Sequence, residues 1–422
     1  MTRLLIVLAI FIALEIYAFQ LIRTLSGDHW WKWVYLAVSI VVILNVILQF
    51  VLYPDRAQIS DSRDIATTLV LAFFLLKLVF FLFMFGEDIY RSIEGLISTL
   101  SQKRESDQSF LPSRRAFIAK IGLAVAALPF GAILYGAWRG KYYYQVREYE
   151  LSFDDLPEAF DGYKITQLSD IHVGSFDDRE EVEYAVNLAN EQQGDVILFT
   201  GDLVNNEARE MEGWEDLFGS LTAKDGVYSV LGNHDYGDYV SWEPKNTEKY
   251  TALELKEEAK KAKAENMQQL YKIQKDMGWR LLLDENEKIT RGADSIQIVG
   301  VQNWGGGRFP KYGDLQKAAT GLTNEEFKIL LSHDPTHWDL QVKGDDKKYQ
   351  LTLSGHTHGM QFGIEIPGFI KLSPAWFVYK KWAGIYKEAD QFLNVNRGFG
   401  FLGYSGRAGI WPEITVITLK KS

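Results

Sequence analysis

Cysteine is absent from this chain of 422 residues, and histidine occurs only seven times. The absence of cysteine excludes disulfide bonds, thiolate metal ligands and thiol catalysis. A metal site here must therefore use oxygen and imidazole donors, which suit Mn, Fe, Zn or Co. Two of the seven histidines, His356 and His358, lie one residue apart in "LTLSGHTHGMQF", directly after a run of strand-forming residues. At the end of a strand, residues two apart point to the same side, so both imidazoles can face one ligand.

Basic residues are scarce in the greater part of the chain. Up to residue 140 there are 13 Lys and Arg against 10 Asp and Glu, and the remainder has 32 against 45. The net charge of -10 therefore comes from the second part. An acidic domain repels phosphate backbones, so nucleic acid is a disfavoured partner and a nuclease is the weaker interpretation.

Long apolar runs are confined to the first third of the chain. Four of them have bilayer-spanning length, at 4–22, 30–53, 65–86 and 116–137. They predict an all-α membrane region over 1–140 with about four transmembrane helices, so the lipid bilayer is an expected partner. Single polar residues interrupt the runs, namely Glu15, Asn45 and Lys77. These either mark a pathway through the membrane or make contacts between helices.

The densest basic loop predicts the orientation in the membrane. It spans 88–115 and contains Arg91, Lys103, Arg104, Arg114 and Arg115. The positive-inside rule places this loop in the cytoplasm and the rest of the chain, after the last helix, outside. The segment "SRRAFIAK" resembles a twin-arginine export motif, which points the same way. Three basic residues that follow the last apolar run favour the opposite orientation. We expect a multi-pass protein of a bacterial inner membrane with an extracytoplasmic catalytic domain.

Alternating strand and helix patterns begin near Tyr143. Apolar strand-like runs occur at 163–168, 196–200, 227–231, 296–301, 328–332, 350–353 and 414–419. Five runs lead into polar clusters, "QLSDIH", "FTGDLV", "LGNHDYG", "LLSHDP" and "LSGHTH". Polar groups at the carboxyl ends of neighbouring strands meet in one crevice. The five clusters are therefore expected to come together.

The clusters supply enough donors for two divalent ions. Asp170 and His172 would bind one ion, and Asn233 and His333 the other. Asp202 could bridge both ions, and His356 and His358 complete the two ligand sets. Taken singly, each cluster could instead cap a turn or fill the core.

The combined pattern D-x-H, G-D, G-N-H-D, H and G-H-x-H resembles the calcineurin-like metallophosphoesterases. Membrane-associated bacterial members are the most similar in "LSHDP", "LSGHTHG" and the terminal "PEI". The resemblance covers roughly 145–420. It implies an α+β fold, a four-layer α/β/β/α sandwich over 145–422. It also implies metal-dependent phosphoric ester hydrolysis, with Mn the favoured ion.

The resemblance also assigns roles to individual residues. It implies that His358 joins the ligands of the first ion and His356 those of the second, with Asp202 shared. His234 becomes the catalytic histidine, which protonates the leaving oxygen. We further expect Asp235 to orient His234, and Arg308 or Arg407 to hold a phosphate that does not react.

Two segments lie outside the family pattern. A helical insertion near 240–285 carries a charge run, which is either a solvated face or a lid over the metals. The loops "NWGGGRFPKYGD" and "RGFGFLGYSGRAGIWPE" lack the spacing of a phosphate-binding P-loop. Their aromatic residues Trp304, Phe309, Phe399, Phe401 and Trp411 either pack the core or shape a pocket.

Three functions follow from these observations. The favoured one is a membrane-anchored phosphoesterase that acts on a phosphorylated envelope or lipid-linked substrate. The alternatives are a nuclease-type phosphodiesterase and a non-catalytic membrane sensor with a structural metal site. An intact His234 weighs against the sensor, because a structural site needs no general acid.

Overall fold

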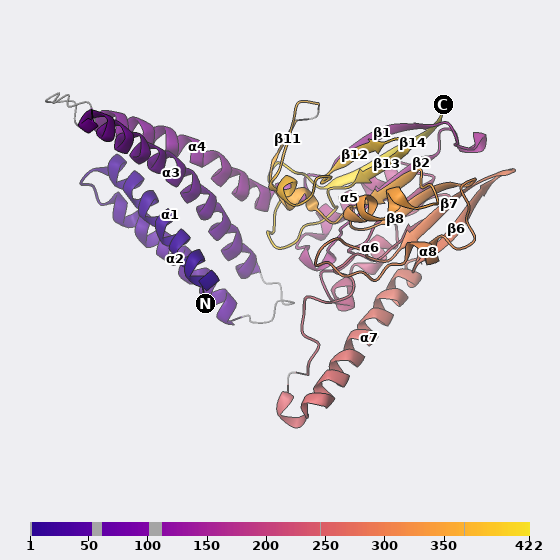
Figure 1. The fold of residues 1–422 in the computed structure, drawn as a ribbon. Helices are drawn as coiled ribbons and strands as arrows, with labels where there is room; N and C mark the ends of the chain where they lie inside the picture. Colours follow the sequence, from indigo (N-terminus) through magenta and orange to yellow (C-terminus); the bar gives the residue numbers. More distant parts are fainter. Residues whose placement is uncertain (1, 53–60, 101–111, 245, 367) are drawn as a thin grey trace. The chain divides into compact units, whose positions relative to one another are not determined.

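The computed structural model describes residues 2–52, 61–100, 112–244, 246–366 and 368–422. They belong to two compact units, one that ends at Trp138 and one that runs from Arg139 to Ser422. The first unit contains only helices, and the second combines two β-sheets with helices (Figure 1).

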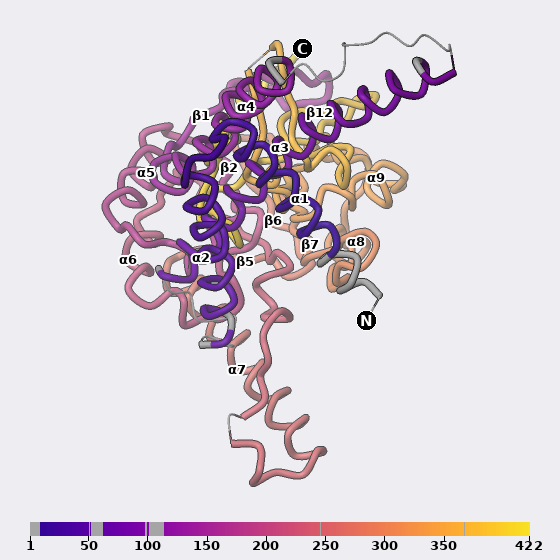
Figure 2. The backbone as a smooth tube through the Cα atoms, turned by 90° about the vertical axis from the view of Figure 1, so that its left-hand side faces the viewer, coloured from indigo at the N-terminus to yellow at the C-terminus, as the bar shows by residue number. Residues whose placement is uncertain are grey.

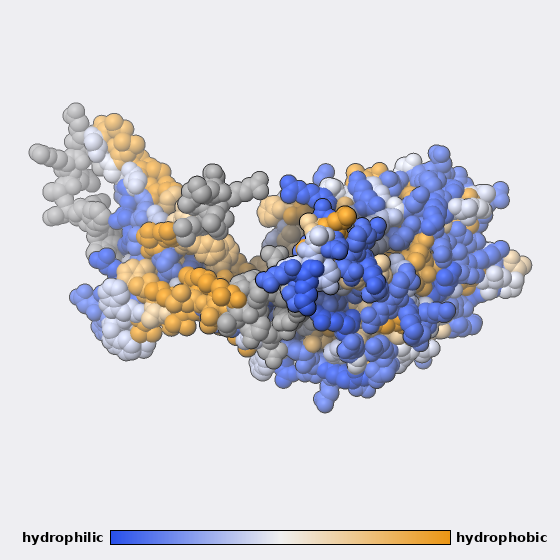
Figure 3. Space-filling model, turned by 90° about the horizontal axis from the view of Figure 1, so that it is seen from below, coloured by the Kyte–Doolittle hydropathy of each residue, from blue (hydrophilic) through white to orange (hydrophobic). Residues whose placement is uncertain are grey.

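Four long helices make up the first unit. They are α1 (Thr2–Ser26), α2 (Trp31–Leu52), α3 (Asp61–Leu100) and α4 (Pro112–Trp138). All four are long and apolar enough to cross a membrane. Large hydrophobic patches lie on the first unit in Figure 3, whereas the second unit shows a mainly hydrophilic face in the same view. The predicted all-α membrane region is confirmed.

Helix α3 is longer than the apolar run predicts, because it continues through a charged segment to Leu100. The expected loop at 88–115 is therefore wrong for its described part. Arg91 belongs to α3, and Arg114 and Arg115 belong to α4. Lys103 and Arg104 lie outside the described residues.

The two arginines of the export-like motif bond to α3. The Arg114 and Arg115 guanidinium groups lie 3.3 and 3.0 Å from the carboxylate of Glu87, which is buried. Arg115 also donates to Asp88 at 2.9 Å. An unpaired buried carboxylate would be costly, so these contacts hold the start of α4 against α3.

Polar residues within the apolar runs make contacts between helices. The Lys77 ammonium on α3 lies 2.6 Å from the Glu15 carboxylate on α1, and it donates to Ser39 on α2 at 2.7 Å. Asn45 accepts a hydrogen bond from Gln49 of its own helix. These bonds support the helix-contact interpretation of Glu15 and Lys77.

The second unit is built on two six-stranded sheets. The first has the strand order β1-β14-β2-β3-β4-β5, and the second β12-β13-β9-β8-β7-β6. The strands of the first sheet are β1 (Gln145–Phe153), β14 (Glu413–Lys421), β2 (Lys164–Leu168), β3 (Val196–Phe199), β4 (Val227–Ser229) and β5 (Trp279–Leu281). Those of the second are β12 (Gly384–Glu388), β13 (Gln391–Val395), β9 (Leu351–Ser354), β8 (Phe327–Ser332), β7 (Asp294–Val301) and β6 (Glu285–Arg291).

Strands β2, β3 and β4 are parallel neighbours, as are β7, β8 and β9. These strands are buried almost throughout, which explains the nearly continuous apolar runs of β3 and β8 in the sequence. Their carboxyl ends carry the five polar clusters.

Side chains of both sheets pack against each other in a central apolar core. Helix α5 (Arg179–Glu191) covers the outer face of the first sheet, and α8 (Leu315–Ala318) and α9 (Thr336–Leu340) cover that of the second. Figure 2 shows these helices on the outside of the unit. The α+β fold with a four-layer sandwich is confirmed.

The predicted insertion is helix α7 (Ala252–Asp276), preceded by the short α6 (Glu215–Phe218). Thr251 caps the start of α7, where its side chain and that of Glu254 bond reciprocally to backbone amides. Asn266 fixes the C-terminal half by accepting a bond from the Ala208 amide at 2.7 Å. The N-terminal half is exposed and extends away from the sandwich (Figures 1 and 2).

Candidate metal centre

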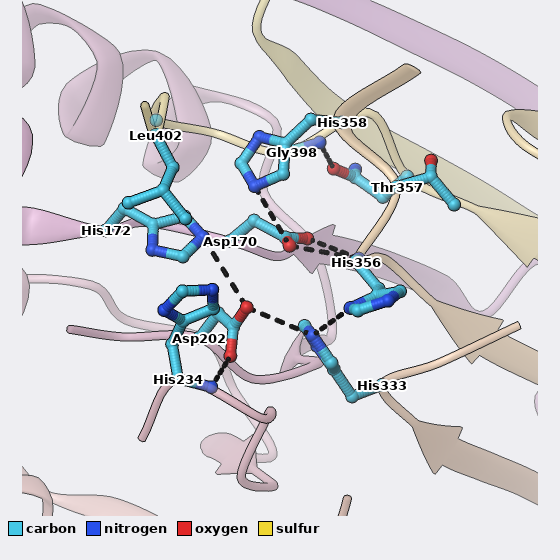
Figure 4. Close-up of polar contacts among 12 residues, drawn as sticks. Asp170, His172, Asp202, His234, His333, His356, Thr357, His358, Gly398 and Leu402 are labelled. Carbon is cyan, nitrogen blue, oxygen red and sulfur yellow. Dashed lines mark hydrogen bonds and ion pairs between the residues drawn. The ribbon is translucent and has the colours of Figure 1, made fainter. Parts of the chain in front are cut away.

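The carboxyl ends of five strands bring the predicted ligands together. Asp170 and His172 follow β2, Asp202 follows β3, and Asn233 follows β4 in the first sheet. His333 follows β8 in the second sheet, and the histidines of the G-H-x-H segment, 356 and 358, follow β9. Figure 4 shows these side chains, apart from Asn233, converging from the two sheets.

The loops that carry these ligands turn sharply. Ten described residues other than glycine have positive φ, and five of these are predicted ligands. The five are Asp170, His172, Asp202, His356 and His358. Left-handed backbone is strained for such residues and concentrates at functional sites.

Two glycines of the motifs allow the loops to approach closely. A Cβ atom at Gly232 would overlap the Asp202 carboxylate, and one at Gly355 would overlap Ser169 and Asp170. No other residue fits at these two positions without moving a ligand.

The first ligand group contains Asp170, His172 and His358. One donor atom from each lies within 4.8 Å of the others, and all three side chains are buried. The His358 Nε2 is 3.3 Å from Asp170. Asp170 also accepts the backbone amide of His356, which ties the β2 loop to the β9 loop.

The second group contains Asp202, His333 and His356, again with donor atoms within 4.8 Å. His333 donates from Nδ1 to the Thr200 carbonyl at 2.8 Å, so its Nε2 is available as a ligand. That Nε2 faces the Nδ1 of His356 at 3.3 Å. The other nitrogen of His356 lies 2.9 Å from the Tyr379 hydroxyl, which orients the ring.

Asp202 lies between the two groups. Its Oδ2 is 3.1 Å from His333 Nε2 and 3.5 Å from His172 Nε2, the position that a bridging carboxylate requires. Asn233 donates from its amide nitrogen to the Tyr239 hydroxyl at 2.8 Å, which leaves its Oδ1 available as a donor to a metal.

Unpaired polar atoms test whether metal ions fit this donor set. Among the buried side-chain atoms without a hydrogen-bond partner in the described residues, four belong to predicted ligands, namely both ring nitrogens of His172, Nε2 of His358 and Oδ1 of Asn233. Buried polar atoms are almost always paired, so these four are expected to have partners that are not amino acids. Oxygen and imidazole donors arranged in two sets suit divalent ions. The residues therefore fit two ions.

The electrostatics of the centre also favour positive charge. Burial opposes ionisation of Asp202, but the neighbouring histidines, His333 foremost, hold its pKa well below the usual range. Burial likewise opposes protonation of His333, yet the Asp202 carboxylate beside it raises the pKa of His333 to about 10. At His333 the carboxylate thus outweighs desolvation, whereas burial lowers the pKa of the other histidine ligands, His172, His356 and His358, and favours the neutral rings that bind metals.

The predicted catalytic histidine, His234, stands beside the ligands. Its backbone amide donates to Asp202 at 2.8 Å, and its Nδ1 is 2.8 Å from the Asn205 carbonyl. A ring held at Nδ1 presents Nε2 for proton transfer. The ring of Tyr239 lies over that of His234 with centroids 4.5 Å apart.

The structure does not place Asp235 against the His234 ring. Its buried carboxylate accepts four backbone amides, those of Asp202, Leu203, Val204 and Gly232. Asp235 therefore holds the β3 and β4 loops together, and Asn205 orients His234 instead. A side chain next to a catalytic histidine in the sequence can point to the opposite side of the loop.

Arg407 is not placed to clamp a substrate. It is fully buried, donates to the Gly400 carbonyl and has Nη2 2.9 Å from Nδ1 of His358. Burial lowers its pKa to about 10. Arg407 is thus a positioning residue for His358.

The role of Arg308 as a phosphate clamp stays a prediction. Arg308 is exposed and precedes Phe309, whose ring is 4.6 Å from that of His356, centroid to centroid. Among the other loop aromatics, Phe399 and Phe401 are fully buried in the core, which confirms packing rather than a pocket for these two.

Tyr239, Tyr379 and Asn205 contact the site but are missing from the predicted set. Each bonds to a ligand or to His234 through a hydroxyl or a carbonyl. No spacing in the sequence marks them. Only Tyr239 had a signal in the sequence, because it follows His234 by five residues in "NHDYGDY" and could for that reason have been included in the site.

Two family models match the chain along most of its length. Residues 1–141 match "Probable Calcineurin-like phosphoesterase, transmembrane domain", and residues 163–360 match "Calcineurin-like phosphoesterase". The chain belongs to the calcineurin-like metallophosphoesterases. It is therefore a metal-dependent phosphoric ester hydrolase with a membrane region, and the resemblance drawn from the motifs is confirmed at the level of the family.

Relatives of this metallophosphoesterase come from bacteria and animals. "Transmembrane protein with metallophosphoesterase domain" of Danio rerio is 28% identical over 355 residues, 82% of this chain and 71% of that protein. "Uncharacterized metallophosphoesterase YkuE" of Bacillus subtilis is 29% identical over 318 residues, 74% of this chain and 98% of that protein. The Bos taurus protein that is also named "Transmembrane protein with metallophosphoesterase domain" is 30% identical over 275 residues. These residues are 64% of this chain and 56% of that protein. The bacterial branch and the export motif stay predictions.

The contact between Arg407 and His358 gives the first testable prediction. In Arg407→Met the His358 ring loses its support, so we expect affinity for one of two Mn ions to fall about 10- to 100-fold while the other is retained. Titration of Mn followed by electron paramagnetic resonance measures both affinities. The matched control is Arg308→Met, an exposed arginine near the same centre, which should leave both unchanged. Equal affinities in Arg407→Met and the unmodified chain, with unchanged circular dichroism, would refute the positioning role.

Proposed function

We propose that this metallophosphoesterase hydrolyses a phosphate ester or pyrophosphate bond in a lipid-linked or other envelope substrate, with two divalent ions, Mn favoured. The observation that carries the proposal is one chain that combines a two-group metal centre with four candidate membrane spans. A catalytic unit held at a bilayer meets lipid-linked substrates at high local concentration.

Residues from both sheets would hold the ions. Asp170, His172 and His358 form one set, and His333, His356 and Asn233 the other, with Asp202 shared. Ions bound in this way activate water as a nucleophile and neutralise the charge of phosphoryl oxygens.

Two residues of the chain would act directly on the substrate. His234 is oriented by the Asn205 carbonyl so that its Nε2 can deliver a proton to the leaving oxygen. Arg308, which is exposed and one residue before Phe309, would contact a second phosphate or a charged head group. A pyrophosphate-containing substrate presents such a second phosphate.

The catalytic unit is proposed to face the extracytoplasmic side of a bacterial inner membrane. An even number of spans puts both termini on the same side, and the α3–α4 connection is flanked by Arg91, Arg114 and Arg115. The positive-inside rule favours the cytoplasm for that connection. A phosphatase-type reporter fused after Ser422 should be active and a cytoplasm-only reporter silent. The reverse pattern would place catalysis in the cytoplasm.

A substrate panel tests the proposed activity. The full chain, purified with Mn, would be assayed against phosphomonoesters, phosphodiesters, single-stranded DNA and lipid-linked pyrophosphates. We expect the highest kcat/KM for a lipid-linked phosphate compound. Preference for DNA would favour a nuclease instead, and no hydrolysis of any compound, despite two bound ions, would favour a metal-binding sensor.

A further inference from the structure

The catalytic unit exposes a group of large apolar side chains on one projecting segment. The strands β10 (Ile364–Ile366) and β11 (Ile370–Leu372) form a two-stranded hairpin, and the short helix η8 (Pro374–Phe377) follows it. The hairpin with β11 stands away from the two sheets (Figure 1). We call the following six side chains the apolar hairpin surface: Ile366, Phe369, Leu372, Trp376, Phe377 and Val378.

The exposure of this surface is unusually high for apolar residues. Phe369 and Phe377 are each 83% exposed, Trp376 is 64% exposed and Leu372 is 63% exposed. Contiguous apolar surface of this kind marks an interaction site in soluble domains, because water contact with it is unfavourable.

The surface is displayed by a well-anchored segment. Between the outward residues of β10, Glu365 points the other way and forms ion pairs with Arg147 and Arg397 at 2.9 and 2.6 Å. Ser373 donates to the Gly359 carbonyl at 2.6 Å and accepts the Ala375 amide. One face of the segment is therefore bonded to the sandwich, and the other face consistently presents apolar side chains.

A membrane is the partner that fits this surface best. Trp and Phe next to lysine, here Trp376 and Phe377 with the exposed Lys380, are the residues enriched where proteins enter the interfacial region of a bilayer. The chain supplies the bilayer, because α4 is a candidate span that ends at Trp138. Only six residues separate α4 from β1, so this tether reaches at most about 20 Å.

A groove adjoins the apolar hairpin surface, and one of its wall residues, Tyr379, contacts the metal centre. It has a volume of about 590 Å³ and lies between α9 and the segment 378–381. Val378 of the hairpin surface and Tyr379 both line it. The hydroxyl of Tyr379 is 2.9 Å from His356, a predicted metal ligand. Exposed Leu340 adds an apolar side chain to the opposite wall.

We propose that the apolar hairpin surface inserts into the membrane that the chain spans, and that the adjoining groove admits an amphiphilic phosphate ester from the lipid to the metals. The insertion rests only on the surface and the tether. The path through the groove rests on the proposed function, since it concerns the same site. The hairpin thereby places the entrance of the groove at the level of the lipid head groups.

The absence of cysteine makes insertion directly measurable. Phe369→Cys in the full chain, labelled with an environment-sensitive fluorophore and reconstituted in phospholipid vesicles, carries one probe on the surface. The matched control is Leu253→Cys, an apolar residue that is 71% exposed and belongs to α7, the helix that extends from the sandwich away from the hairpin (Figure 1). We expect nitroxide-labelled lipids to quench the Phe369 probe several-fold more strongly than the Leu253 probe.

Other occupants of the surface would give different results. The probe at 369 could be shielded from water without being quenched by the labelled lipids. If this shielding depends on protein concentration, a second copy of the chain covers the surface. Shielding without quenching that is independent of concentration would indicate contact with the helices of the same chain. Either result, or equal quenching at 369 and 253, would overturn the proposal.

A second variant tests the path through the groove. Phe369→Asp combined with Phe377→Asp removes most of the lipid affinity without touching the metal centre. Turnover of a long-chain phosphate ester embedded in vesicles should fall about tenfold or more, while that of soluble nitrophenyl phosphate esters stays unchanged. Equal turnover of the embedded ester in the variant and the unmodified chain would refute the path. If the unmodified chain hydrolyses soluble esters only, the lipid-linked substrate fails, whereas the quenching result stands on its own.

Discussion

Replacement of Asp202 by asparagine is expected to lower kcat/KM by about three orders of magnitude or more. Its Oδ2 lies 3.1 Å from His333 and 3.5 Å from His172, so it is the carboxylate that we expect both ions to share. Loss of that negative charge lowers the affinity for both ions. The transition state then loses several kcal/mol of the charge stabilisation that the ions supply. The amide oxygen of asparagine can still accept the His234 backbone bond, so the loop should keep its shape.

The matched control for this prediction is Asp334→Asn. Asp334 is also buried beside the centre, with Oδ2 3.5 Å from His356, but it belongs to neither ligand group. Because Asp334 only supports a ligand, its replacement should lower kcat/KM about 10- to 100-fold. Steady-state kinetics on one ester under saturating Mn compare the two variants. A loss in Asp202→Asn no larger than that in Asp334→Asn would contradict the bridging role.

His234→Asn is expected to affect substrates according to their leaving groups. General acid catalysis contributes about 100- to 10,000-fold where the departing oxygen is a poor leaving group, and little where it is activated. The variant should retain both ions, keep appreciable turnover of a nitrophenyl ester, and lose far more with an alkyl or sugar ester. A leaving-group series on the unmodified enzyme checks that chemistry limits the rate for both kinds of substrate.

Tyr239→Phe provides the control for His234. This change removes the hydroxyl that accepts from Asn233 but leaves the aromatic ring over His234. It should alter metal affinity without changing the dependence on the leaving group. Equal losses of His234→Asn on both ester types, with metals bound, would assign His234 to a phosphoryl-oxygen contact instead of proton donation.

The parallel strands and the ligand loops were predictable because their signals are local. The buried parallel strands β3 and β8 are nearly continuous apolar runs, β2 mixes apolar and polar residues, and a short polar motif follows each of the three. Because the carboxyl ends of parallel strands meet at one edge of a sheet, the sequence alone predicts that Asp170, Asp202 and His333 share one site.

Residues that support the ligands were not predictable from spacing. Arg407 reaches His358 across 49 positions, and Asn205 reaches His234 across 29. Asp235 is adjacent to His234 in the sequence, yet its carboxylate points to the backbone of the Asp202 loop. Such contacts depend on how loops cross in three dimensions.

Helices and strands without a regular spacing of apolar residues were also not predicted. Helix α3 extends past its apolar run through Glu87 and Arg91, which looks like a loop by hydropathy. Its charged part is stabilised by ion pairs of Arg91 with Glu87 and Asp88 within the helix and by the ion pairs of Glu87 with α4. The hairpin of β10 and β11 is equally short and exposed, so its alternation around Glu365 became apparent only in the structure.

The number of divalent ions bound by the full chain tests the account most directly. The purified chain would be saturated with Mn, freed of unbound ion by gel filtration, and measured by elemental analysis beside Asp202→Asn. The two ligand groups predict two ions per unmodified chain and fewer in the variant. No more than one ion per unmodified chain under saturating Mn would contradict the dinuclear centre on which the proposed function depends.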